Sequence, residues 1–92
     1  MRARFIGPVN DLARQTERTR DWTRALACYQ RGLEVDDLAE EFYQGAMRAH
    51  HQLGNRSRAL DTYHRCKRHL SISLSITPSP ATEALYMSIR HG

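Results

Sequence analysis

Apolar residues recur every three or four positions through most of the chain, which is the spacing of one face of an α-helix. In the segment 21–36 this stripe consists of Trp22, Ala25, Leu26, Tyr29 and Leu33. Similar stripes predict further helices over residues 10–19, 37–53, 56–74 and 80–90. The pattern of apolar and polar positions therefore predicts an all-α protein.

The breaks between the predicted helices carry residues that start or stop a helix. Gly54 suits the left-handed residue that closes a helix, and Ser79 followed by Pro80 is a strong helix start. Asp37 and Glu40, three residues apart, resemble a capping box in which Asp replaces Ser or Thr. Residues 71–76 alternate between serine and apolar residues, which is typical of a strand. A lone strand is unstable, so we expect the preceding helix to continue to about residue 74.

The chain also repeats itself at a distance of 34 residues. Residues 24–31, Arg-Ala-Leu-Ala-Cys-Tyr-Gln-Arg, align with residues 58–65, Arg-Ala-Leu-Asp-Thr-Tyr-His-Arg, and five of the eight positions are identical. A period of 34 residues is that of the tetratricopeptide repeat, a hairpin of two helices. We therefore predict one domain, residues 1–92, built as a right-handed tetratricopeptide-like stack of antiparallel hairpins. Its parts are a first repeat at about 6–36, a second at about 37–74, a linker at 75–79 and a capping helix at 80–90.

Each repeat contains an alanine followed four residues later by a tyrosine, Ala25 with Tyr29 and Ala59 with Tyr63. Two helices approach closely where one carries a small side chain, and the aromatic ring fills the gap one turn later. On the last helix we expect Ala81 to lie on the packing face. The predicted repeat core consists of Trp22, Ala25, Leu26, Tyr29, Phe42, Ala59, Leu60, Tyr63 and Leu85.

Two hairpins and a cap bury a continuous core only with neighbours present, so we expect the chain to be the end of a longer array. Phe5, Ile6 and Val9 lie where a preceding hairpin would stack. We expect these residues either to be exposed or to be covered by a second copy of the chain in a homodimer.

Composition narrows the class of protein. Apolar residues make up 40% of the chain, which supports a core, and no apolar run is long enough to span a membrane. The 14 basic and 10 acidic residues give a net charge of +4, spread along the sequence. Without a secretory signal, Cys28 and Cys66 are expected to be reduced thiols in the cytoplasm.

Stacked hairpins form a concave groove lined by the first helix of each pair, and we predict a partner-binding site there. Arginines in such a groove suit carboxylates, which they bind through paired hydrogen bonds. The alternative is that these residues are only the polar faces of amphipathic helices. The predicted groove residues are Asn10, Arg14, Glu17, Arg18, Gln44, Arg48, His51 and Gln52.

No arrangement of residues predicts catalysis, a metal site or a cofactor, and the glycines match no phosphate-binding pattern. Several potential metal ligands lack the spacing of a four-ligand site: His50, His51, His64, Cys66 and His69. The densest basic cluster is spread around one predicted helix, and no row of aromatic residues accompanies it, so direct DNA contact is not expected. This cluster consists of Arg56, Arg58, Arg65, Lys67 and Arg68.

Four stretches carry a family resemblance: residues 37–43, 47–50, 53–63 and 76–86. They resemble the bacterial transcriptional activator domain, a tetratricopeptide-like helical module of bacterial regulators. The most specific part is Pro-Ser-Pro-Ala-Thr-Glu-Ala-Leu-Tyr at 78–86, and the resemblance covers roughly residues 20–90. Members usually carry a glycine where Ser75 stands.

The resemblance implies a non-catalytic module in signal-dependent transcription. Its partners would be other domains of the same regulator or another protein. Two alternatives stay open, a general tetratricopeptide adaptor unrelated to transcription and a basic nucleic-acid-binding module. An upstream winged-helix or ATPase domain would favour the regulator.

Overall fold

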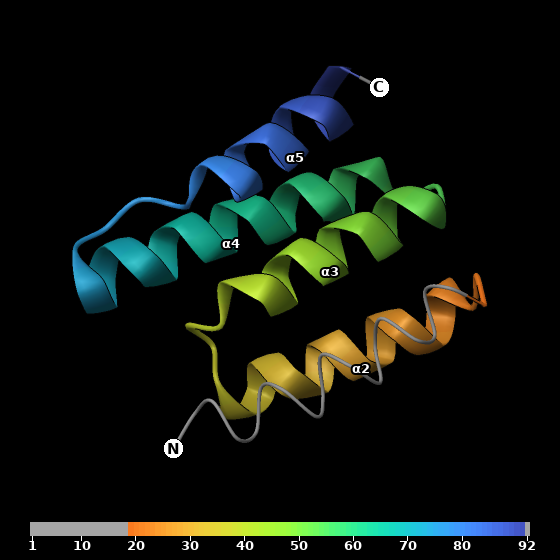
Figure 1. Ribbon diagram of the computed structural model, residues 1–92, viewed down its shortest axis with the longest axis horizontal. Coiled ribbons are helices and arrows are strands. Elements are labelled where there is room, and N and C mark those ends of the chain that lie inside the picture. The colour runs from red at the N-terminus through yellow and green to blue at the C-terminus, as the bar shows by residue number, and fades with distance from the viewer. Residues whose placement is uncertain (1–18, 92) are drawn as a thin grey trace.

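The computed structural model of the chain describes residues 19–91. They form four helices, α2 (Trp22–Val35), α3 (Glu40–Gln52), α4 (Arg56–Leu74) and α5 (Pro80–His91), and residues 19–91 contain no strand (Figure 1). The all-α prediction is confirmed for this part of the chain. The helix expected at 10–19 and the apolar residues Phe5, Ile6 and Val9 lie outside it, apart from residue 19.

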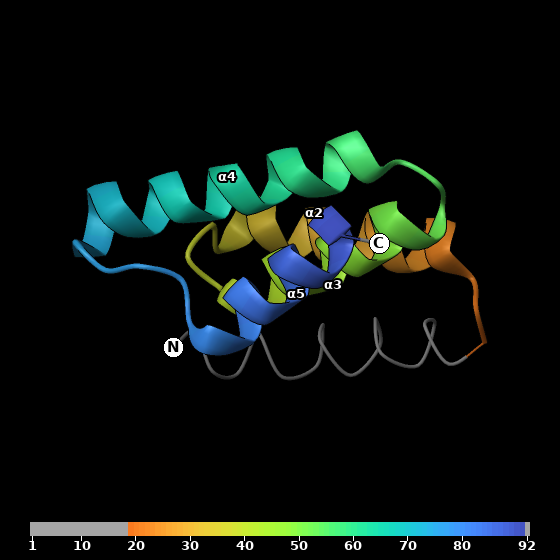
Figure 2. The same cartoon turned by 90° about the horizontal axis from the view of Figure 1, so that it is seen from above.

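Successive helices run in opposite directions, and α3 lies between α2 and α4 (Figure 1). The last helix, α5, packs against both α3 and α4 and runs in the same direction as α3. In the turned view of Figure 2, α4 and α5 lie at different heights, so the four helices do not form one flat layer. Because α3 contacts every other described helix, it forms the centre of the packing.

The repeated alanine and tyrosine are buried in both halves of the described chain. Ala25 and Ala59 have no exposed surface, and Tyr29 and Tyr63 are buried as well. Tyr29 packs near Phe42 with ring centroids 6.3 Å apart, whereas Tyr63 stacks on Tyr86 at 3.9 Å. The other predicted core residues, Trp22, Leu26, Leu60 and Leu85, are half-buried. The alanine and the tyrosine of each repeat are therefore core positions, as the repeat predicted.

Two glycines make room for the aromatic rings of the core. A Cβ atom added at Gly45 would overlap with Cζ, Cε1 and Cε2 of Tyr29, and one at Gly32 would lie 2.6 Å from Cε2 of Phe42. Both rings are fully buried and cannot swing away. The close packing of α2 against α3 therefore requires glycine at these two positions.

The segment 71–76 adopts the helical alternative rather than the strand. The helix α4 continues to Leu74, and its C-cap, Ser75, has a φ of 54°, in the left-handed region. Gly54 occupies the same region at the end of α3, with a φ of 81°. A residue other than glycine is strained there, which explains the glycine that members of the family usually carry at the position of Ser75.

At the start of α5 the buried residue is not the one that the hydrophobic pattern predicted. The prediction that Ala81 lies on the packing face is wrong, because Ala81 is exposed and its neighbour Thr82 is fully buried. The capping box expected from Asp37 and Glu40 is also absent, since the N-cap of α3 is Ala39, which makes no side-chain cap hydrogen bond. The Glu40 carboxylate instead bonds to residues at the start of α5.

Candidate interaction surfaces

The Pro-Ser-Pro-x-Thr stretch joins α5 to the start of α3 through a partly buried hydrogen-bonded junction. The backbone N–H of Ser79 donates to Glu40 Oε2 at 2.7 Å, and the Thr82 hydroxyl donates to the same oxygen. Gln44 Nε2 donates in turn to Thr82 Oγ1 at 2.8 Å. Ser79 Oγ accepts from the Thr82 backbone N–H at 3.4 Å, as an N-cap residue does. The family-like motif thus fixes the capping helix on α3.

The Glu40 carboxyl is held in its ionised form by this junction. Burial on its own raises the pKa of Glu40, but hydrogen bonds from Thr82 and Ser79 outweigh burial, and the pKa lies below its ordinary value of 4.5. Hydrogen bonds that favour the charged form have this effect on a carboxyl group. The junction is therefore strongest when Glu40 is charged.

The structure describes four of the eight residues predicted to line the concave groove. Gln52 is exposed, whereas Arg48 and His51 are half-buried on α3. Gln44 does not stand free in an open groove, because its amide bonds to Thr82 of α5. The remaining predicted groove residues, Asn10, Arg14, Glu17 and Arg18, lie outside the described residues.

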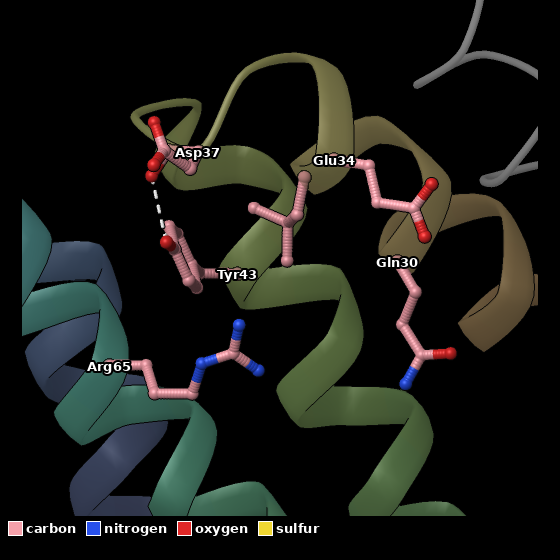
Figure 3. Close-up of a pocket in the computed structure, with 6 residues that line it drawn as sticks. Gln30, Glu34, Asp37, Tyr43 and Arg65 are labelled. Atoms are coloured by element: carbon pink, nitrogen blue, oxygen red, sulfur yellow. Dashed lines mark hydrogen bonds between the residues drawn. The ribbon is translucent and has the colours of Figure 1, made fainter.

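Two cavities lie between α2 and α4, with α3 as their floor, and Figure 3 shows the first of them. The first has a volume of about 290 Å³ and is lined by Gln30, Leu33, Glu34, Asp37, Tyr43 and Arg65. The second has a volume of about 270 Å³ and is lined by Gln30, His50, Arg58, Asp61, Thr62 and Arg65. Since Gln30 and Arg65 belong to both, the two cavities form one groove, which we call the α2–α4 groove.

Several polar side chains of the α2–α4 groove have no internal partner. Within residues 19–91 the guanidinium groups of Arg58 and Arg65, the amide of Gln30 and the carboxylate of Asp61 make no hydrogen bond or ion pair. Figure 3 shows Arg65 extending from α4 toward α3, with Gln30 on α2 on the other side of α3. These groups are available to a ligand or partner.

Tyr43 forms one end of the groove and is held by hydrogen bonds to two other elements. Its hydroxyl donates to the backbone oxygen of Asp37 at 2.7 Å, so the contact with His69 Nδ1, also 2.7 Å, uses the proton of the imidazole. Burial, with the nearby Cys66 and Asp37, raises the pKa of Tyr43 to about 12. Its phenol is therefore neutral and serves as a fixed wall of the groove.

His50 lies at the other end of the groove, and its buried side chain lacks a hydrogen-bond partner at Nδ1 among the described residues. Only 6% of the residue is exposed. Burial, followed by the charge of Arg58, lowers the pKa of His50 below its ordinary value of 6.5. The imidazole is therefore neutral at pH 7. Its Nδ1 atom is buried without a hydrogen bond to residues 19–91, which is energetically unfavourable, and a ligand that bonds to this atom would remove that penalty.

The remaining chemistry of the described residues is structural. Residues 19–91 hold no group of three His, Cys, Asp or Glu side chains that could bind a metal ion. The Cys66 thiol is fully buried, and burial raises its pKa to about 12, so it is not a reactive nucleophile. No helix in the same range is long and apolar enough to cross a membrane.

Some residues of the α2–α4 groove were singled out from the sequence, but they were not predicted to line one groove. Arg58 and Arg65 were grouped with other basic residues of α4, and His50 with potential metal ligands. A usable signal was present, because Arg58 and Arg65 are seven residues apart and therefore lie on one face of a helix. Lys67 and Arg68, which are also exposed on α4, line neither cavity.

Comparison with known proteins agrees with the motif at the start of α5. The family model described as the bacterial transcriptional activator domain matches residues 1–90, which is nearly the whole chain. No curated protein and no solved structure gives a significant match. Together with the all-helical architecture, the match shows that the chain belongs to the bacterial transcriptional activator domain family.

Proposed function

We propose that the chain is a non-catalytic protein–protein interaction module of a bacterial transcriptional regulator. In this proposal it couples a signal to transcription by packing against other domains of the regulator or against a separate protein. The observation that carries the proposal is the family match over residues 1–90. The antiparallel packing of α2 on α3 and of α3 on α4 supports a tetratricopeptide-like stack as the underlying architecture.

The packing of the described helices suits a module of this kind. The Glu40 junction holds α5 on α3, so the described helices form one connected body. A partner that binds such a body more tightly in one state of the regulator shifts the population toward that state. The surfaces proposed for this role are the half-buried face of α3 around Arg48 and His51, the α2–α4 groove, and a homodimer contact through the uncapped N-terminal face.

The test changes the chromosomal gene and measures transcripts. Phe42 is fully buried beside Tyr29, so Phe42→Asp removes the folded module, whereas Ser57→Ala alters only an exposed position of α4. RNA sequencing is expected to show a limited set of altered transcripts with Phe42→Asp and none with Ser57→Ala. Unchanged transcripts in both strains, with altered co-purifying proteins, would instead identify an adaptor unrelated to transcription.

A further inference from the structure

The α2–α4 groove has the length of a short peptide segment. Its floor residues, Tyr43 and His50, are seven residues apart on α3, which corresponds to roughly 10.5 Å along the helix axis. A peptide in the extended polyproline II conformation advances roughly 3.1 Å per residue with three residues per turn, so side chains three positions apart lie on one face and reach from one cavity to the other. A ligand that fills both cavities therefore places side chains about three positions apart over Tyr43 and His50.

The cavity over His50 suits an acidic side chain. It is lined by the guanidinium groups of Arg58 and Arg65 and by one opposing carboxylate, that of Asp61. With a neutral imidazole, this end carries an excess of positive charge, and neither guanidinium has a partner within residues 19–91. Two arginines on one helix face can bind a carboxylate through charge-assisted hydrogen bonds.

The cavity over Tyr43 suits a basic side chain. Glu34 and Asp37 contribute two carboxylates there, while the phenol is neutral. Leu33 adds an apolar contact within this cavity, and the charge of Arg65, which lines both cavities, excludes a second cation from the centre. Positive and negative charges are thus separated along the groove, which specifies a partner with the opposite order of charges.

We propose that the α2–α4 groove binds an extended segment of a partner protein in which an acidic and a basic side chain are about three residues apart. The acidic side chain lies between Arg58 and Arg65, and the basic side chain lies against Glu34 and Asp37. This rests on the proposed function, since it assigns one surface of the interaction module to one chemical class of partner.

The experiment titrates the isotopically labelled chain with synthetic peptides and follows it by NMR. The probes are capped alanine–serine octapeptides that carry Glu and Lys three positions apart, in both orders, and the same peptide with Gln at both positions. We expect one charged peptide to shift the resonances of Gln30, Tyr43 and His50 and to bind about tenfold more tightly than the Gln peptide.

Three variants locate the bound peptide. Arg65 lines both cavities, so Arg65→Gln is expected to weaken binding about tenfold or more. Arg68→Gln removes the same charge from an exposed position of α4 outside the groove and is expected to change affinity less than about twofold. Asp61→Asn removes the carboxylate that opposes an acidic ligand and is expected to tighten binding.

Three results would overturn the proposed groove specificity. These are an absence of shifts in the groove at millimolar peptide, equal binding of the Gln peptide, and equal losses from Arg65→Gln and Arg68→Gln. None of these results affects the transcript experiment. If Phe42→Asp alters transcripts while the peptides fail to bind selectively, the proposed role in transcription stands and only the proposed groove specificity is rejected. Conversely, unchanged transcripts with selective peptide binding would reject the role in transcription and retain the groove.

Discussion

The close contact between Tyr29 and Gly45 predicts that a single added methyl group destabilises the fold. Alanine favours a helix over glycine by about 1 kcal/mol, so Gly45→Ala in the middle of α3 would be stabilising if space allowed. The new Cβ, however, would overlap with three atoms of the buried Tyr29 ring. Overpacking costs about 1–3 kcal/mol, and an overlap with three atoms of a buried ring places this case in the upper part of that range, about 2–3 kcal/mol, so it outweighs the gain in helix propensity.

We expect Gly45→Ala to lower the free energy of unfolding by about 1–2 kcal/mol, which corresponds to a fall in Tm of roughly 5–15 °C for a domain of this size. Tyr29→Leu removes the atoms that the new methyl group would meet. In that background Gly45→Ala is expected to be stabilising by about 1 kcal/mol, because only helix propensity remains.

Urea unfolding followed by circular dichroism measures all four members of this double-mutant cycle. Ser57→Ala, at an exposed position of α4, serves as the control for a change in helix propensity alone. A Gly45→Ala protein as stable as the parent would refute the packing argument. The same penalty in the presence and absence of Tyr29→Leu would show that the cost arises elsewhere.

Three further changes probe other features of the fold. Ser75→Gly is expected to raise the free energy of unfolding by about 1 kcal/mol, because it relieves a left-handed residue, and a lower Tm would contradict this. The lowered pKa of Glu40 contributes stability above its ordinary value of 4.5 that is lost as the pH falls toward the folded-state pKa. Stability should therefore decline more between about pH 5 and 3 in the parent than in Glu40→Gln, and parallel curves would refute the assignment. Burial raises the pKa of the Cys66 thiol to about 12, so a thiol reagent at about pH 8 should label half-exposed Cys28 and reach Cys66 only on unfolding, as mass spectrometry would detect.

The sequence was most informative where a residue type fits only one environment. The paired alanines and tyrosines of the 34-residue repeat mark buried positions, because a small residue followed by a ring one turn later is useful only between packed helices. The end of α3 and the start of α5 were likewise predicted within one or two residues from Gly54, Ser79 and Pro80, whereas α3 begins three residues after the predicted Asp37. Local rules were sufficient at these positions.

The sequence failed where burial depends on a distant polar partner. Thr82 is buried because its hydroxyl bonds to Glu40 and Gln44, which lie about 40 positions earlier, whereas hydrophobic patterning selected Ala81. The α2–α4 groove was missed for a related reason. Arg58 and Arg65 look like ordinary exposed residues until tertiary packing places Gln30 opposite them.

The junction between α3 and α5 also determines when α5 docks on α3 during synthesis. Glu40 precedes Ser79 by 39 residues and Thr82 by 42 residues, so the ribosome releases α3 and α4 before the residues that complete the junction. At about 5–20 residues per second, this delay lasts roughly 2–8 s. Tyr63 is synthesised 19 residues before Thr82, so for roughly the last 1–4 s of that interval the surface around Met47 and Tyr63, which α5 later covers, is available to chaperones that bind nascent chains.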